Sequence, residues 1–390
     1  MNPRMFRMMM LALTLTAASE WLMVAWVFHA TQGGPMAATT AVLVFVGLFA
    51  ANAVLLPAAR RRIHDTGPSL WFSRSFTLGS VTALMTGLLL ASAMLVAFVI
   101  SLGFGLAGAE REALHNAFSA GAMALGAGAG LWGSTVGNQR VRVDSLNVSL
   151  KDMPSDHPGL GIAHVSDLHI GPLLRGTRLT RFIEQINRLE AEIIVITGDI
   201  FDFDPRYVEE GCEALGKLRA RHGVYAVLGN HDHYTGTDRV VAGLNGVASL
   251  RLLRDSWERI ETPEGAFAIA GLDDPVDGWM DKHAEHRELE RLAAEIPDDL
   301  PRLLLVHRPS YFHHAEELGF PLVLAGHTHG GQIALPFAAN TNVSRMISER
   351  TRGLFAYGES QMYVNRGLGM AGLPLRLNCP REIALIQLSP

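Results

Sequence analysis

The sequence predicts an α/β domain preceded by an all-α bundle of four transmembrane helices. Residues 1–138 hold no Lys, seven Arg and four acidic residues, whereas the remainder holds 26 basic and 34 acidic residues. Long apolar stretches fill the first part. Beyond it, short apolar runs alternate between strand-like and helix-like spacing. We therefore expect two domains, 1–138 and 139–390.

Four apolar stretches in the first domain each reach the roughly 20 residues needed to cross the hydrocarbon core as a helix. A secretory signal peptide would account for the first stretch only. The fourth is rich in Gly and Ala, so it either packs inside the bundle or forms a dimerisation face. In the first, Glu20 either marks a pathway or has a structural explanation, by lying near an interface or pairing with a neighbour. The stretches cover residues 5–30, 36–58, 78–107 and 117–136.

Basic residues around these stretches favour a cytoplasmic N-terminus. Two of the loops hold only Arg111, beside Glu110 and Glu112. Because basic residues accumulate on the cytoplasmic side, we expect a multi-pass protein of the inner (plasma) membrane with its large domain in the cytoplasm. The residues on the predicted cytoplasmic side are Arg4, Arg7, Arg60, Arg61, Arg62, Arg74, Arg140 and Arg142.

The second domain has a formal net charge of −8. Such a charge repels phosphate backbones, so we expect no nucleic-acid partner. A metal site would supply the missing positive charge locally. Cys212 and Cys379 lie far apart and form no CxxC motif, so no disulfide framework is expected.

Five apolar runs that we interpret as strands each end in Asp, Asn or His where the chain turns. In α/β sheets, ligands bind outside the carboxyl ends of strands, so these polar side chains should converge. Residues 233–300 interrupt the rhythm and could form a cap or specificity region. The five runs are residues 161–166, 193–197, 224–228, 303–306 and 322–325.

The polar residues at these strand ends suit two metal ions. Mixed carboxylate and imidazole ligands favour Mn, Fe or Zn. Asp167 and His169 are two residues apart, as are His327 and His329, so one turn can direct each pair toward one ion. Two ions that share one carboxylate need about this many protein groups. The predicted ligands are Asp167, His169, Asp199, Asn230, His307, His327 and His329.

The motifs that contain these ligands resemble those of the calcineurin-like metallophosphoesterases, in order and approximate spacing, over residues 140–390. They are Asp167-Leu-His169, Gly198-Asp199, Gly229-Asn-His-Asp232, Val306-His307 and Gly326-His-Thr-His-Gly-Gly-Gln332. With Asn365-Arg-Gly-Leu-Gly369 and Leu377-Asn-Cys-Pro-Arg-Glu-Ile383, they are similar to a bacterial membrane-associated branch. That branch includes YkuE-type and YaeI-type phosphoesterases and lipid A precursor hydrolases. The resemblance implies a four-layer α/β/β/α sandwich.

The resemblance also implies a role for each ligand. Asp167, His169 and His329 would hold the first ion. Asn230, His307 and His327 would hold the second, and Asp199 would bridge the two. A hydroxide shared by the ions would attack phosphorus in line.

Two further residues are implied to act at the reacting centre. His231 would stabilise the transition state or protonate the leaving oxygen, and Asp202 would orient it. Phe203 and Asp232 occupy places where phosphoprotein phosphatases have an Arg-Gly pair and a Glu. This departure counts against a protein phosphatase.

We therefore expect a metal-dependent phosphoric ester hydrolase of the phosphodiesterase or pyrophosphatase type. Its cofactors would be two divalent or trivalent ions, Mn foremost, with Fe or Zn as alternatives. Its partners would be the lipid bilayer and a membrane-associated or lipid-linked phosphate ester. The alternatives are a tethered phosphodiesterase acting on soluble nucleotides, or a transmembrane sensor with a phosphoesterase output domain.

Overall fold

The computed structural model describes residues 3–62, 68–149, 159–262, 265–276, 287–335, 338–346, 348–371 and 374–389. The chain divides into two compact units, Met1–Val136 and Gly137–Pro390.

Four helices form the first unit: α1 (Pro3–Gln32), α2 (Ala38–Arg62), α3 (Pro68–Gly103) and α4 (Gly108–Trp132), with a π-helical turn, η1 (Gly133–Gly137), after them. Within the described residues, three helices are long and apolar enough to cross a membrane, over Met10–Gln32, Ala38–Ala59 and Trp71–Gly103. The predicted fourth span, 117–136, is not among them. The reason is that α4 begins with charged residues around Glu110 and continues in Gly and Ala, which contribute little apolar surface.

Helix α4 packs antiparallel to α3 through small residues. A Cβ added at Gly126 would lie 2.3 Å from Thr86 Oγ1, and one at Gly130 would lie 2.4 Å from Thr82 Cγ2. The order of these contacts shows that α4 runs back toward the start of α3. This Gly-rich stretch therefore packs inside the unit.

The carboxylate of Glu20 in α1 is paired. Asn52 Nδ2 of α2 donates a hydrogen bond to Glu20 Oε2 at 2.6 Å. Of the two interpretations of this carboxylate, pairing with a neighbour is the one that the structure supports.

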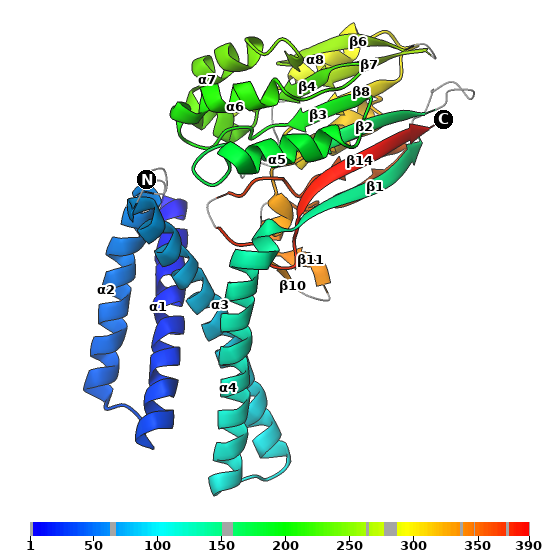
Figure 1. Cartoon of the computed structure of the whole chain (residues 1–390). Helices are drawn as coiled ribbons and strands as arrows, with labels where there is room; N and C mark the ends of the chain where they lie inside the picture. The colour runs from blue at the N-terminus through cyan, green and yellow to red at the C-terminus, as the bar shows by residue number, and fades with distance from the viewer. Residues whose placement is uncertain are drawn as a thin grey trace. The chain divides into compact units, whose positions relative to one another are not determined.

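Two six-stranded sheets form the centre of the second unit (Figure 1). In the first, β2, β3, β4 and β5 are parallel, and the C-terminal strand β14 lies between β1 and β2. Its strands in spatial order are β1 (Val141–Ser149), β14 (Arg381–Ser389), β2 (Leu160–Val165), β3 (Ile193–Thr197), β4 (Val224–Val227) and β5 (Leu250–Leu252).

In the second sheet, β13, β9, β8 and β7 are parallel and the two edge strands are antiparallel to them. Its strands in spatial order are β12 (Gly353–Tyr357), β13 (Ser360–Val364), β9 (Leu322–Ala325), β8 (Arg302–Leu305), β7 (Gly265–Gly271) and β6 (Ser256–Thr262). A small separate pair is formed by β10 (Ala334–Leu335) and β11 (Ala338–Asn342).

The candidate cap, 233–300, contributes β5 to the first sheet and β6 and β7 to the second. These strands are part of the sandwich, so a cap could come only from the rest of the range. Residues 277–286, within the candidate cap, lie outside the described residues.

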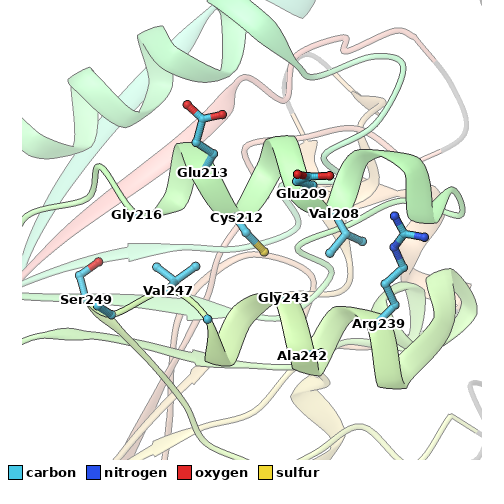
Figure 2. Close-up of a pocket in the computed structure, with 12 residues that line it drawn as sticks. Val208, Glu209, Cys212, Glu213, Gly216, Arg239, Ala242, Gly243, Val247 and Ser249 are labelled. Carbon is cyan, nitrogen blue, oxygen red and sulfur yellow. The ribbon is translucent and has the colours of Figure 1, made fainter.

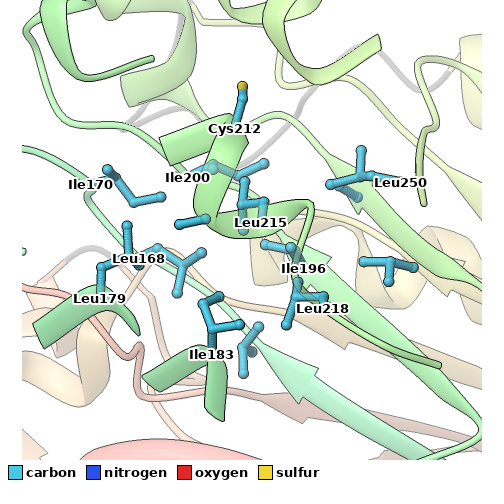
Figure 3. Close-up of a cluster of buried hydrophobic side chains, with 14 of the residues drawn as sticks. Leu168, Ile170, Leu179, Ile183, Ile196, Ile200, Cys212, Leu215, Leu218 and Leu250 are labelled. Carbon is cyan, nitrogen blue, oxygen red and sulfur yellow. The ribbon is translucent and has the colours of Figure 1, made fainter. Parts of the chain in front are cut away.

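Helices cover both outer faces. Along β3, Ile194 and Ile196 face helices, whereas Ile193 and Val195 face the other sheet, as the two-residue period of a strand requires. Figure 3 shows Leu215 and Ile196 in the cluster of buried side chains between the first sheet and the helices that cover it. The first sheet is covered by α5 (Gly176–Asn187), α6 (Val208–Leu215) and α7 (Asn230–Asn245), and the second by α8 (Arg287–Glu295) and α9 (Phe312–Glu317). The predicted α/β/β/α sandwich is confirmed.

Candidate metal centre

Five strands, three from the first sheet and two from the second, end where the predicted ligands begin. Strands β2, β3 and β4 are parallel neighbours, as are β8 and β9. Their carboxyl ends therefore meet at one edge of the sandwich. The first ligand after each strand is Asp167, Asp199, Asn230, His307 and His327, respectively.

Five of the seven predicted ligands have a left-handed backbone. Such values cost a non-glycine residue about 1–2 kcal/mol and cluster at functional sites. The turns after β2 and β3 support one another, because the Asp167 N–H donates to Gly198 O and the His169 N–H donates to Asp199 O, each at 3.0 Å. The φ angles are 50° at Asp167, 45° at His169, 49° at Asp199, 72° at His327 and 51° at His329.

A first group comprises Asp167, His169, Asp199 and His329, whose potential ligand atoms all lie within 4.8 Å of one another. His169 Nε2 and His329 Nε2 are 2.9 Å apart. His329 Nε2 is 3.3 Å from Asp167 Oδ1, and His169 Nε2 is 3.6 Å from Asp199 Oδ2. Nitrogen and oxygen lone pairs thus converge on one point.

A second group comprises Asp199, His307 and His327. His307 Nε2 lies 3.3 Å from Asp199 Oδ2 and 3.1 Å from His327 Nδ1. The other ring nitrogen, His307 Nδ1, lies 2.9 Å from Thr197 O, and a proton there leaves Nε2 as the lone-pair donor. Asp199 belongs to both groups, which is the arrangement that a bridging carboxylate needs.

Asn230 lies at the start of α7, beside the second group. Its buried Oδ1 atom has no hydrogen-bond partner among the described residues. The preceding Gly229 is in close contact, because an added Cβ would lie 2.3 Å from Asp199 Oδ1 and 2.8 Å from His307 Cε1. An unpaired buried amide oxygen beside two ligands fits a cation better than it fits a packed core.

The electrostatics of the cluster also fit cations. Burial alone would lower the pKa of His307, but Asp199 and then Asp167 outweigh it and raise that pKa to about 10. Burial would raise the pKa of Asp199, but His307 and His231 hold it well below its usual range. Burial and a neighbouring histidine keep the pKa of His327 low. The carboxylates thus require nearby positive charge, which two metal ions would supply in place of protons.

His231 and Asp202 lie beside the first group. Asp202 Oδ1 is 3.4 Å from His231 Nδ1 and 3.6 Å from His169 Nδ1. Burial would raise the pKa of Asp202, but the neighbouring imidazoles of His169 and His231 lower it well below its usual range. The rings of His231 and His169 are 4.6 Å apart, edge to face. Asp202 can therefore orient both rings.

The model of the calcineurin-like phosphoesterase family matches residues 160–331, which contain all nine predicted site residues. An uncharacterized metallophosphoesterase of Bacillus subtilis (strain 168), YkuE, is 30% identical over 280 residues, 71% of this chain and 95% of that protein. The chain belongs to the calcineurin-like phosphoesterase family. It is a metal-dependent phosphoesterase.

A transmembrane relative also matches this phosphoesterase. The Danio rerio transmembrane protein with metallophosphoesterase domain is 29% identical over 257 residues, 64% of this chain and 58% of that protein. Among solved structures, TT1561 of Thermus thermophilus has a TM-score of 0.38 and 14% identity, over 54% of this chain and 90% of that one. Together with the three apolar helices, the transmembrane relative indicates that this phosphoesterase is a membrane protein.

Asp232 supports the site in a way that the sequence did not reveal. Its carboxylate is fully buried and accepts backbone N–H groups of Ile200 at 3.2 Å, Phe201 at 2.8 Å and Gly229 at 2.8 Å. It thereby ties the turn after β3 to the turn after β4. The Asn-His-Asp motif marked the residue, but only the fold shows what it holds.

A second support comes from the segment after β13. The Gly369 N–H donates to Asp167 O at 2.6 Å. Arg376 is fully buried, and its Nη2 donates to the carbonyls of Arg366, Gly367 and Gly369 at 3.0, 3.0 and 2.8 Å. The segment thus lies directly behind the first metal-binding turn.

A groove of about 750 Å³ lies elsewhere, between α6 and α7 (Figure 2). Its lining includes Val208, Cys212 and Gly243, and none of the nine predicted site residues. It is therefore separate from the metal centre.

Proposed function

We propose that this phosphoesterase is a phosphodiesterase or pyrophosphatase that hydrolyses a membrane-associated or lipid-linked phosphate ester. The observation that carries the proposal is the short connection between its N-terminal helical unit, which holds the candidate membrane spans, and its catalytic unit. Strand β1 begins at Val141, four residues after η1 ends at Gly137. Four residues span at most about 14 Å. A soluble nucleotide gains little from such a tether, whereas a lipid phosphate cannot leave the membrane.

The start of the catalytic unit is firmly held, which makes the tether short in practice. Arg381 Nε donates to Asn138 O and Arg381 Nη2 donates to Asn138 Oδ1, both at 2.7 Å. Arg178 Nη2 donates to the same carbonyl at 3.0 Å. The chain therefore enters β1 from a fixed point. Exposed Arg140 adds a positive charge there, worth about 1 kcal/mol near anionic head groups.

The residues divide the chemistry as follows. One ion would be held by Asp167, His169 and His329, the other by Asn230, His307 and His327, and Asp199 would serve both. The donor set suits Mn, Fe or Zn. When bound, the ions supply charge to the phosphate oxygens and activate the attacking water.

Protonation of the leaving oxygen is carried out by side chains of the protein. His231 donates a proton to the leaving oxygen, and Asp202 keeps its ring in position and its charge compensated. His231 is suited to this role because it lies against His169 and outside the two groups that share Asp199. With His169 and Asp202 it forms a third cluster of possible ligand atoms, in which we assign it the proton rather than an ion.

We also propose that the catalytic unit is cytoplasmic, at the inner (plasma) membrane. Arg60–Arg62 at the end of α2 and Arg74 near the start of α3 support a cytoplasmic loop there. Helix α4 is less apolar than the three candidate spans, but it runs back along α3 toward that same end through small-residue contacts, so the chain would leave the bundle on the Arg74 side.

The test compares the full-length protein with a chain that begins at Gly137, which keeps Asn138 and its contacts with Arg178 and Arg381. Both are loaded with Mn and assayed on a lipid-embedded phosphodiester in vesicles and on a small chromogenic diester. The proposal requires the truncated chain to lose most activity on the lipid while keeping it on the small diester. If the full-length and the truncated protein have equal activity on each substrate, the helices have no role in catalysis. Nucleotides are assayed in parallel, and a preference for them over the lipid would favour the soluble-substrate alternative.

A further inference from the structure

Two exposed aromatic rings lie beside the proposed acid. Phe203, directly after Asp202, is 39% exposed, and Tyr234, near the start of α7, is 44% exposed. Their ring planes are within 4° of parallel, with centroids 5.8 Å apart. His231 contacts both, with centroid distances of 4.4 Å to Phe203 and 5.6 Å to Tyr234.

These rings are held by the same turns that hold the metal centre. Phe203 lies in the turn that follows β3 and Asp199. Tyr234 lies near the start of α7, which follows β4 and begins at Asn230. Asp232 ties the two turns together through the backbone of Phe201 and Gly229. The aromatic pair is therefore fixed relative to His231, and its exposure is built into the site.

Exposed aromatic pairs beside a reacting centre suit contact with a ligand, because removing their apolar surface from water lowers the free energy of the complex. His231 is the group placed to protonate the leaving oxygen, so whatever is bonded to that oxygen must lie next to it. Phe203 and Tyr234 are both exposed and both in ring contact with His231.

We propose that Phe203 and Tyr234 form a subsite for an apolar group carried by the leaving oxygen of the substrate. The inference deepens the proposed function and rests on the role assigned to His231 there. The two residues bind and orient the leaving group and take no part in proton transfer.

The test measures binding of three non-hydrolysable probes to the full-length, Mn-loaded protein by calorimetry: phenylphosphonate, cyclohexylphosphonate and methylphosphonate. The wild type is expected to bind the phenyl and cyclohexyl probes about tenfold more tightly than the methyl probe. The double variant Phe203→Ala/Tyr234→Ala should bind all three about equally. The conservative variants Phe203→Tyr and Tyr234→Phe should keep the preference.

Tyr357→Ala is the matched control. Tyr357 is 47% exposed and contacts a histidine, His313, at 4.1 Å, but it lies at the end of β12 that pairs with Ser360, opposite the Val364 end that leads toward the metal centre. This variant should bind the probes as the wild type does. Bound Mn, measured by elemental analysis, shows whether the double variant is intact. If it is not, the single variants Phe203→Ala and Tyr234→Ala replace it, and each should reduce the preference.

A wild type without the preference, or a double variant that retains it, overturns the proposal. So does equal weakening of all three probes, because it would mean that the rings only support His231. The vesicle comparison is independent of this result, since soluble probes report the subsite whether or not the helices matter.

Discussion

Replacing Asp199 by Asn tests the shared carboxylate most directly. The change keeps the size of the side chain. The Oδ1 atom of Asn can still accept the hydrogen bond that the backbone N–H of His231 donates to Asp199 Oδ1 at 2.8 Å. It removes the negative charge whose Oδ2 lies 3.3 Å from His307 Nε2 and 3.6 Å from His169 Nε2. Both ligand groups contain this residue, so both should lose affinity. His329 belongs to the first group only, so His329→Ala should weaken one site.

The size of the effect follows from mass action. With free Mn at ten times the wild-type Kd, each site is about 90% filled, and a loss of about 100-fold in affinity leaves it about 9% filled. Elemental analysis after dialysis should then find about 1.8 ions per chain in the wild type, about 1.0 in His329→Ala and about 0.2 in Asp199→Asn. Hydrolysis should be abolished in Asp199→Asn. If that variant keeps one full ion, the shared role is refuted.

Three further changes test other parts of the reasoning. His231→Ala should keep both ions and lower turnover roughly 10²–10⁴-fold, least on p-nitrophenyl esters, and loss of metal would show a wrong assignment. Asp232→Ala removes the acceptor of three buried N–H groups and should cost about 3 kcal/mol, a melting point lower by roughly 6–12 °C, where Glu261→Ala at an exposed site should cost little. Reporter fusions should be external near Gly33 and cytoplasmic after Asn138, and an external signal at Asn138 would reverse the orientation.

The layers of the sandwich could be predicted from sequence because strand and helix periods report which residues face an apolar neighbour. Ile193 and Ile194 point to different layers for this reason alone. The convergence of the predicted ligands could be predicted as well, since the first of each group follows an apolar run by two or three residues. The sequence could not show that β14 inserts between β1 and β2, because that pairing joins residues more than 200 positions apart.

The prediction of a fourth apolar span was wrong, and only part of the candidate cap region is available to form a cap. Length suggested a fourth apolar span, but α4 makes helix contacts through Gly126 and Gly130 and is not apolar enough to be one of the candidate spans. The break in rhythm after His233 suggested a cap, yet β6 and β7 extend the second sheet. Local composition indicates which secondary structure a segment can form, but its contacts with other segments determine where that structure lies.

The residues that escaped prediction explain how the site keeps its shape. Five left-handed ligands at about 1–2 kcal/mol each cost about 5–10 kcal/mol, which approaches the whole stability of a domain. Local preference cannot hold such turns. Asp232 holds the turn after β3, which contains Asp199. The Gly369 N–H, in the segment that buried Arg376 fixes, holds the turn after β2, which contains Asp167. The predicted metal centre therefore depends as much on these buried hydrogen bonds as on its predicted ligands. Because the partners come from distant segments, only the ligands are visible in the sequence.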